Sequence, residues 1–271
     1  MPQPPADPIH PDEPPRIPLR PGGRPEENPT LTFRPADGPP RGAVMVLPGG
    51  GYAFLSTDRE GRRIAGPLHA AGFDVAVLRY RIAPGHRHPA MIRDATDGIR
   101  LLRRLLREAG RPTRVGMMGF SAGGHLAASL ALHGDRFDER PRPGGDPEAR
   151  VDALVLGYPV IDLEPPRAHR NSRLALLGED PDPALLDAMC LHRHVTAAAP
   201  PAFLFHTAND GPVPVGNTLA YASACEAAGV PFSCHVYEDG EHGLGLAADH
   251  PEARLWFPAA CAFLGRHLAE G

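Results

Sequence analysis

The sequence predicts an α/β protein with a mostly parallel central sheet, helices on both faces and a small cap segment. Short apolar runs alternate along the chain with longer stretches in which apolar residues recur every three or four positions. Several of the short runs are apolar at consecutive positions, which is typical of strands buried on both faces of a sheet. The length of 271 residues and the hydrophobic content of 42% suffice for one large domain.

The elements can be assigned in order from this alternation. The clearest helix is 91–110, because Ile92, Ile99 and Leu106 share one face and arginines occupy the other. Gly72 is expected to be the C-cap residue that ends the helix at 56–72. Strands are expected at 30–35, 42–51, 73–81, 114–120, 151–162, 201–210 and 232–239. Helices are expected at 56–72, 91–110, 125–134, 217–229 and 251–269.

The segments between these elements define the domain organisation. Residues 1–29 are dense in proline, and we expect an arm that is extended on the surface or disordered. Residues 30–271 are expected to form a single domain. Within it, the polar stretch 135–150 indicates a surface loop. Short helical stretches broken by proline predict a small cap at about 165–200.

The composition excludes several classes of protein. The formal net charge is −4, and all 28 basic residues are arginine, which we interpret as a compositional bias. No nucleic-acid partner is therefore expected. No run approaches the roughly 18 apolar residues of a transmembrane helix. The N-terminal stretch lacks the basic and apolar regions of a secretory signal, so we expect a cytoplasmic protein without membrane contact.

The stretch Gly119-Phe120-Ser121-Ala122-Gly123 fits the pattern Gly-x-Ser-x-Gly between a predicted strand and a predicted helix. A sharp turn at this point strains the serine backbone and lifts its hydroxyl out of the sheet. Both flanking positions must lack side chains, because strand and helix approach closely there. A helix N-terminus also favours a developing negative charge. The alternative is a plain glycine-rich turn, but the context favours Ser121 as a nucleophile.

A serine nucleophile needs a general base and an acid that orients it, and on this architecture the acid precedes the histidine in the chain. Asp210 follows an apolar strand and would lie at the carboxyl edge of the sheet. It also suits a turn, and the two roles are compatible. Asn209 cannot carry the negative charge that stabilises an imidazolium. His242 lies in a glycine-flanked loop after the last strand, and we predict that it is the base.

No metal and no cofactor are expected. His125 lies on the helix after the turn, where packing or hydrogen bonding behind the nucleophile is its expected role. Two His-x-His pairs, at 86–88 and 192–194, lack a third ligand of fixed spacing. The four cysteines also lack metal-ligand spacing and are too few for a disulfide scaffold: Cys190, Cys225, Cys234 and Cys261. Cys225 and Cys234 lie in predicted elements, which suits buried free thiols.

The glycines after the strand at 42–51 are candidate oxyanion donors. The N–H of Gly50 or Gly51, together with that of Ala122, would bind the oxygen. The alternatives are a flexible loop or a weak mimic of a phosphate loop, although Walker and dinucleotide patterns are absent. Three aromatic residues are expected to line the substrate pocket: Tyr52, Phe54 and Tyr158.

Five blocks occur in order: "VLPGGGYAFLSTDREG", "LRYR", "MMGFSAGGHLAASLA", "YPVI" and "HTANDGPVPVGNTLAYASACEAAGVPFSCHVYEDGEHGLGL". From about residue 17 to the end, the chain resembles the serine esterases of the α/β-hydrolase fold, and more narrowly their acetyl esterase/acetylxylan esterase-like branch, often labelled esterase/lipase or xylanase-associated esterase. The resemblance implies that Ser121 is the nucleophile, His242 the base and Asp210 the acid. It also implies that the Gly50–Gly51 loop is part of an oxyanion hole.

The chain departs from that family at two positions. Asn209 replaces the first of two acids that often precede the Val-Pro-Val element, and Gly216 stands where the family often has glutamate. The family's Glu-Gly pair persists as Glu60-Gly61. We expect Glu60 to make a buried polar contact, with Arg79 or Arg81 as candidate partners.

The expected reaction is hydrolysis of a carboxylic ester with a small acyl group through an acyl-enzyme. The substrate would be a small-molecule or carbohydrate ester. One alternative is an amide- or formamide-cleaving hydrolase on the same fold, such as a peptidase or an arylformamidase. Another is a non-catalytic binding module, which would normally lack one of the three residues. The sequence carries no signal for the oligomeric state.

Overall fold

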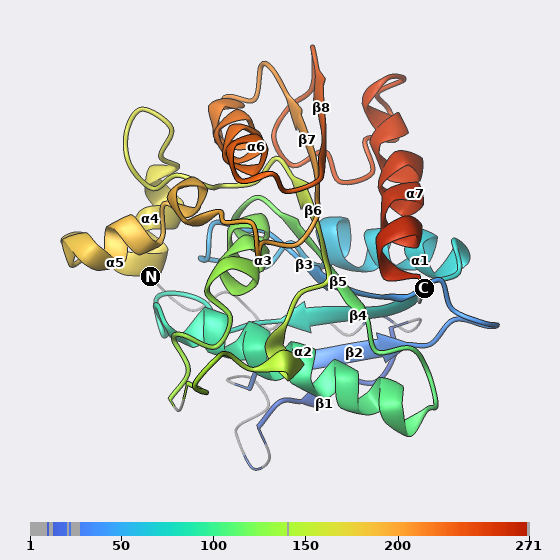
Figure 1. Cartoon of the computed structure of the whole chain (residues 1–271). Helices are drawn as coiled ribbons and strands as arrows, with labels where there is room; N and C mark the ends of the chain where they lie inside the picture. The colour runs from blue at the N-terminus through green and yellow to red at the C-terminus, as the bar shows by residue number, and fades with distance from the viewer. Residues whose placement is uncertain (1–9, 11–12, 21, 23–27, 140, 270–271) are drawn as a thin grey trace.

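The computed structural model describes residues 10, 13–20, 22, 28–139 and 141–269. Its centre is an eight-stranded sheet in the order β1-β2-β4-β3-β5-β6-β7-β8 (Figure 1). The first two pairings, β1 with β2 and β2 with β4, are antiparallel, and all the others are parallel. The strands are β1 (Ile17–Pro18), β2 (Thr30–Arg34), β3 (Ala43–Leu47), β4 (Asp74–Arg79), β5 (Val115–Phe120), β6 (Ala153–Gly157), β7 (Ala202–Thr207) and β8 (Phe232–Tyr237).

Helices cover both faces of the sheet, and each face has its own apolar core. Helices α1 (Arg63–Ala70) and α7 (Trp256–Leu268) lie together on one side in Figure 1. They pack with Val44, Val46 and Phe205. The opposite core holds Met45 and Leu47, because successive strand side chains point to opposite faces. Its helices are α2 (Ala90–Glu108), α3 (Ala122–His133) and α6 (Gly216–Ala228).

The predicted α/β class and the order of its elements are confirmed, and several elements differ from the expected ranges in extent. The helix expected at 125–134 begins at Ala122, since packing against β5 holds two glycines in helical conformation. The helix expected at 56–72 is a π-helix, η1 (Thr57–Arg62), followed by α1. The strand expected at 151–162 ends at Gly157, and the amide of Val160 already bonds to the Ser121 carbonyl.

The segment at about 165–200 forms short helices that pack onto the main body. They are α4 (Arg170–Leu177), α5 (Pro183–Ala188) and the 3-10 helix η3 (Leu191–His194). Leu176, Met189 and Leu191 are buried in the same core as α3. His133 Nε2 bonds to the carbonyl of Ala188 at 2.7 Å. This segment therefore extends the body of the protein at the edge where β6 and β7 end.

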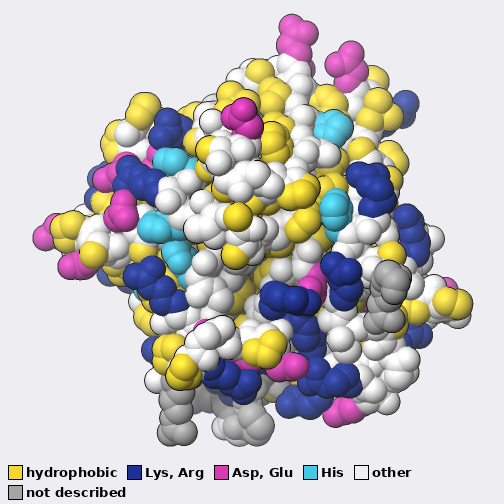
Figure 2. Space-filling view, in the orientation of Figure 1, with side chains coloured by type: hydrophobic (Ala, Val, Ile, Leu, Met, Phe, Trp, Pro, Cys, Tyr) yellow, Lys and Arg dark blue, Asp and Glu magenta, His cyan; other side chains and the backbone are white. Residues whose placement is uncertain are grey.

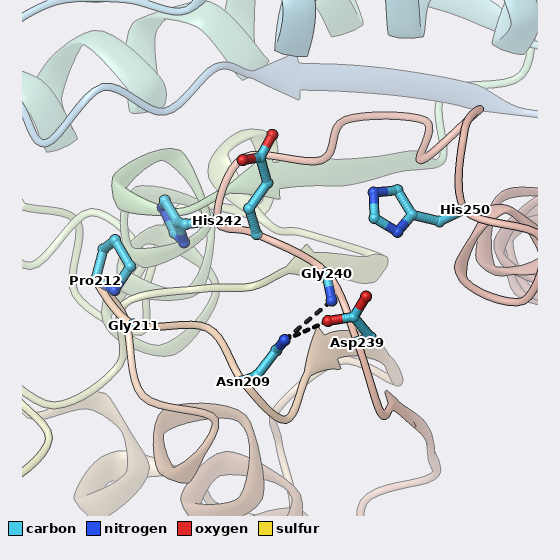
Figure 3. Close-up of a pocket in the computed structure, with 8 residues that line it drawn as sticks. Asn209, Gly211, Pro212, Asp239, Gly240, His242 and His250 are labelled. Atoms are coloured by element: carbon cyan, nitrogen blue, oxygen red, sulfur yellow. Dashed lines mark hydrogen bonds between the residues drawn. The ribbon is translucent and has the colours of Figure 1, made fainter.

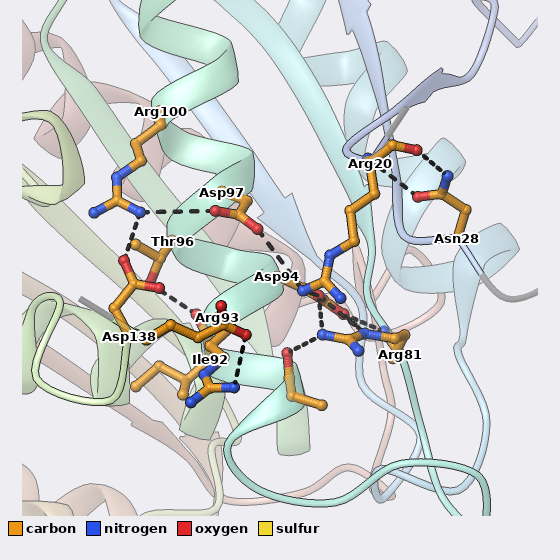
Figure 4. A network of polar contacts seen from close by, with 12 residues as sticks. Arg20, Asn28, Arg81, Ile92, Arg93, Asp94, Thr96, Asp97, Arg100 and Asp138 are labelled. Carbon is orange, nitrogen blue, oxygen red and sulfur yellow. Dashed lines mark hydrogen bonds and ion pairs between the residues drawn. The ribbon is translucent and has the colours of Figure 1, made fainter. Parts of the chain in front are cut away.

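Part of the proline-rich arm is attached to the sheet. Much of the predicted 1–29 arm lies outside the described residues, which do not include 1–9, 11–12, 21 and 23–27. Strand β1 adds to the sheet edge beside β2. The Arg20 guanidinium reaches Asp94 of α2 at 3.3 Å, and Arg81 binds the same buried carboxylate at 2.7 Å (Figure 4). The described part of the arm is thus held by backbone pairing and by a shared ion pair.

Arginine side chains gather over α2 and the neighbouring strands on the face shown in Figure 2, with acidic side chains between them. Many of these arginines are paired: Arg93 lies 3.3 Å from Glu139, and Arg100 lies 2.6 Å from Asp138 (Figure 4). Among the helices of the described ranges, none combines the length and the apolarity required to cross a membrane.

Candidate active site

Ser121 lies on a tight turn between β5 and α3. Its φ of 51° and ψ of −120° place a non-glycine residue in a strained region. A Cβ at Gly119 would overlap the carbonyl oxygen of Gly123, and one at Gly123 would overlap that of Leu47. The two glycines are therefore required by the close approach of strand, helix and loop, as predicted. Helix α3 begins at Ala122, whose N–H belongs to the first, unpaired helical turn.

Three side chains that are far apart in the sequence form one series of hydrogen bonds. The Ser121 hydroxyl lies 2.9 Å from His242 Nε2, and His242 Nδ1 lies 2.7 Å from Asp210 Oδ2. Because a carboxylate only accepts, Nδ1 carries the proton and Nε2 is left to accept from the serine. The Asp210 side chain is fully buried, and the His242 side chain is 20% exposed. This arrangement can deprotonate the serine and hold the resulting imidazolium.

Asp210 is held as a carboxylate by donors on both oxygens. Val213 N–H donates to Oδ1 at 2.9 Å, and His206 Nε2 lies 3.2 Å from Oδ2. Burial by itself raises the pKa of Asp210. The hydrogen bonds from His206, His242 and Val213 more than offset it, so the pKa lies well below its ordinary value. Asp210 is therefore negatively charged when it faces the base.

Sequence reasoning missed His206. It is fully buried on β7, and its Nε2 also lies 2.9 Å from the carbonyl of Val213. A carbonyl only accepts, so Nε2 bears the proton, and Nδ1 accepts from the Thr218 hydroxyl at 2.7 Å. The spacing His206-x-x-x-Asp210 at the end of a predicted strand was the available signal. The spacing alone does not show that the turn after β7 brings Asp210 back to the imidazole ring of His206.

The acid and base loops are also joined by side chains. Asn209 Oδ1 accepts from Gly240 N–H at 2.9 Å, and Asn209 Nδ2 donates to Asp239. The Thr207 hydroxyl donates to the Gly240 carbonyl at 2.7 Å. Gly240 is thus bonded at both its N–H and its C=O, two residues before His242. Asn209 cannot replace the acid, but it fixes the loop that carries the base.

The Gly-Gly-Gly loop after β3 passes beside the serine, since a Cβ at Gly49 would lie 2.9 Å from the Ser121 Cβ. Gly50 has a φ of 125°, and a Cβ there would overlap the Phe54 carbonyl, so the bend requires glycine. The N–H of Gly49 donates to Glu60 Oε2 at 2.8 Å. Gly49 is therefore occupied, and Gly50 and Gly51 remain as candidate donors.

Tyr52 and Tyr158, which are predicted to line the substrate pocket, are both buried in this structure, and their hydroxyls bond to internal partners. The Tyr52 hydroxyl donates to His125 Nδ1 at 2.8 Å, and the Tyr158 hydroxyl donates to Glu60 Oε1 at 2.8 Å. The expectation for His125 is confirmed: its Nε2 donates to the Met189 carbonyl, and burial lowers its pKa to about 4. Of the three aromatic candidates, Phe54 is 55% exposed.

Glu60 also differs from its expected contact with Arg81. That arginine binds Asp94, whereas Glu60 bonds to Gly49 and Tyr158. The expected buried polar contact of Glu60 is present, with Gly49 and Tyr158 as its partners.

A hollow of about 560 Å³ adjoins His242 between the acid and base loops (Figure 3). Its lining includes the side chains of Asn209, Asp239, Glu241 and His250. Side chains of this kind can form hydrogen bonds with the hydroxyl groups of a ligand.

Among the described residues, one group has the donor types and spacing to hold a metal ion: Asp162, Glu164 and Cys190. Asp162 is already paired with Arg167 at 2.7 Å, and Glu164 is paired with Arg193. Burial raises the pKa of the Cys190 thiol to about 11. These contacts fit an ion-paired network at the base of the cap segment better than a cation site.

A family model described as BD-FAE matches residues 33–224. Endo-1,4-beta-xylanase B of Butyrivibrio fibrisolvens is 32% identical over 215 residues, which are 77% of this chain and 33% of that protein. Acetylxylan esterase of Xylanibacter ruminicola is 32% identical over 209 residues, 75% of this chain and 41% of that protein. The chain thus spans between a third and about two fifths of the length of these relatives.

A solved structure covers nearly the whole chain. It is the acetyl ester-xyloside bifunctional hydrolase from Caldicellulosiruptor lactoaceticus, with a TM-score of 0.84 and 36% identity over 95% of this chain and 98% of that one. The chain belongs to the BD-FAE family and has the α/β-hydrolase fold.

Proposed function

We propose that this chain hydrolyses carboxylic esters of small acyl groups through an acyl-enzyme formed on Ser121. The observation that carries the proposal is the hydrogen-bond series from Ser121 to His242 to Asp210, at 2.9 and 2.7 Å. His242 takes the serine proton as the hydroxyl attacks the ester carbonyl, and it then donates that proton to the leaving alcohol. Water repeats these steps to release the acid.

The oxyanion of the tetrahedral intermediate would accept from the N–H of Ala122 and from the N–H of Gly50 or Gly51. The start of α3 favours negative charge at this point. Such donors contribute about 10²–10³ in rate each in serine hydrolases. The glycine loop therefore supplies a share of the rate comparable to that of the general base.

The substrate assignment is supported by the hollow beside His242, which has side chains that can form hydrogen bonds with a hydroxyl-bearing alcohol such as a sugar. Two similar proteins are named for acetylxylan and acetyl ester-xyloside hydrolysis.

The test is a rate series on p-nitrophenyl acetate, butyrate and octanoate, on acetylated xylo-oligosaccharides, and on matched anilide and formamide substrates. We expect the acetyl esters to be fastest and Ser121→Ala to lower kcat/KM by about 10⁴ or more. Ser129→Ala is the matched control, because it removes a buried hydroxyl from the same helix. Ester turnover that survives in Ser121→Ala would refute the proposal. Faster turnover of the anilide or formamide would favour the amide-cleaving alternative.

A cytoplasmic location is part of the proposal. It is supported by the state of the cysteines, since all four are free thiols. Cell fractionation with an antibody to the chain tests it, and recovery in the extracellular fraction would contradict it.

A further inference from the structure

Glu60 is a buried carboxyl group that the proposed reaction does not use. It lies on η1 beneath the site and is only 4% exposed. Its Oε2 accepts from Gly49 N–H, and its Oε1 accepts from the Tyr158 hydroxyl, both at 2.8 Å. A buried charge is costly unless it is hydrogen-bonded. Because Glu60 is buried beside the candidate active site and both its oxygens accept hydrogen bonds, we infer that its carboxyl group has a role in that site.

The contacts of Tyr158 connect Glu60 to the loop that carries the base. The Tyr158 hydroxyl accepts from Gly245 N–H at 3.0 Å. Its ring packs edge-on against the His242 ring, with 5.0 Å between centroids. One continuous series of hydrogen bonds thus runs from Gly49, beside Ser121, through Glu60 and Tyr158 to Gly245. It joins the candidate oxyanion loop to the base loop.

The directions of these bonds favour the ionised form of Glu60. The Tyr158 hydroxyl accepts from Gly245, so its own proton is directed to Glu60. Gly49 N–H can only donate, so both oxygens of Glu60 accept. Burial raises the pKa of Glu60 above its ordinary value, and the hydrogen bonds from Tyr158, Gly49 and Ser56 together with attraction to His242 offset part of that rise. Burial and the charge of Glu60 raise the pKa of Tyr158 well above its ordinary value, so the phenol keeps its proton.

We propose that Glu60 is a positioning residue for the reaction at Ser121, which holds the Gly49 end of the oxyanion loop and stabilises the protonated form of His242 by its negative charge. The inference rests on the proposed function, since it assigns Glu60 a part in that reaction. Glu60 does not touch the reacting atoms. It acts through the backbone of Gly49 and through the electrostatic potential at the imidazole.

Other charged and titratable groups also face this region. Asp210 binds His242 directly, and His169 of the cap segment interacts with His242 electrostatically. Arg59 bonds to the Gly243 carbonyl, and Tyr80 lies within the field of Glu60. The remaining ones line the hollow beside His242: Asp239, Glu241 and His250. These side chains are all retained when Glu60 alone is replaced, so a difference between variant and wild type reports the loss of the Glu60 carboxylate, through its charge and its hydrogen bonds.

The test is Glu60→Gln, which keeps the shape and removes the charge. A glutamine can still accept from Gly49 through its oxygen and donate to the Tyr158 hydroxyl through its nitrogen. Without the negative charge of Glu60, the positive charge that develops on the imidazole during the reaction is less stabilised. We expect the acidic limb of the kcat/KM pH profile to shift down by about half a pH unit or more. We also expect kcat at the optimum to fall about tenfold, as the loop is held less firmly.

Asp58→Asn is the matched control, since Asp58 lies on the same π-helix but is half-exposed and paired with Arg62 and Arg63. Its profile should coincide with that of the wild type. An active Glu60→Gln enzyme with an unshifted acidic limb would overturn the inference and leave the proposed function intact. Failure of the proposed function looks different, because the wild type would then show no ester turnover and no fluorophosphonate label.

Tyr158→Phe is the second variant and decides the case if Glu60→Gln does not fold. It removes the hydrogen bond to Glu60 and the hydrogen bond from Gly245 N–H, while it keeps the ring against His242. We expect kcat to fall at least severalfold with KM near the wild-type value, because the loop and not substrate binding is affected. An unchanged kcat in folded Tyr158→Phe would overturn the inference.

Discussion

The turn that carries Ser121 and the loops that carry Asp210 and His242 are held in place by different physics. At Ser121 the backbone segments are so close that Gly119 and Gly123 have no room for a Cβ. In the other two loops the positions are set by polar contacts, such as those of Asn209 and Thr207 with Gly240. Steric exclusion gives a single, rigid placement of the nucleophile. Hydrogen bonds place the acid and base, and each bond can be removed by one substitution.

The largest effect is expected from Gly123→Ala. The added methyl overlaps the Leu47 carbonyl, so β3 and α3 must separate and the turn at Ser121 opens. We expect the free energy of unfolding to fall by about 3 kcal/mol or more and ester turnover to be lost. Denaturant titration and the p-nitrophenyl acetate assay measure the two effects.

Gly66→Ala is the control for that variant. Gly66 is also helical, in α1, but a Cβ there meets no atom within 4 Å. This alanine should stabilise the protein by about 0.5–1 kcal/mol, because helical glycine is entropically costly. Equal stability losses in the two variants would contradict the steric account of the turn.

The next largest effect is expected from Asp210→Asn, which leaves the fold intact but misorients the base. An amide facing His242 Nδ1 no longer fixes the tautomer or stabilises the imidazolium. We expect kcat to fall by about 10³–10⁴ with little change in KM. A loss below tenfold would show that Asp210 is not the orienting acid.

A smaller effect is expected from Asn209→Ala, which removes the bond to Gly240 and the bond to Asp239. Thr207 still binds the Gly240 carbonyl, so the base loop loses only part of its support. We expect kcat/KM to fall about tenfold and the free energy of unfolding to fall by about 1 kcal/mol. If activity stays at the wild-type level, polar contacts do not limit the placement of the base.

The smallest effect concerns stability in acid. Since the pKa of Asp210 is lower in the folded than in the unfolded chain, its carboxylate stabilises the fold above the unfolded value of about 3.9. That stabilisation is lost as the pH falls toward the folded value. From about pH 6 to about pH 3, the wild type should lose about 1 kcal/mol more unfolding free energy than Asp210→Asn. Parallel curves from denaturant titrations would contradict this linkage.

The contrast between the steric placement of Ser121 and the hydrogen-bonded placement of Asp210 and His242 also explains which features the sequence could predict. The turn at Ser121 and the order of the strands depend on local signals, such as the spacing of Gly119 and Gly123 and the apolar runs. The contact between Glu60 and Tyr158 joins residues 98 positions apart, and no local pattern encodes it. Tyr52 was assigned to the pocket from its residue type, yet its ring points into the core and its hydroxyl binds His125.

The most direct test of the central claim is the structure of the protein after reaction with a fluorophosphonate, with the labelled peptide mapped by mass spectrometry. The account predicts one adduct, on the Ser121 Oγ. The phosphonyl oxygen should lie about 2.7–3.1 Å from the N–H of Ala122 and from that of Gly50 or Gly51. An adduct on another residue, or a phosphonyl oxygen directed away from these amides, would contradict it.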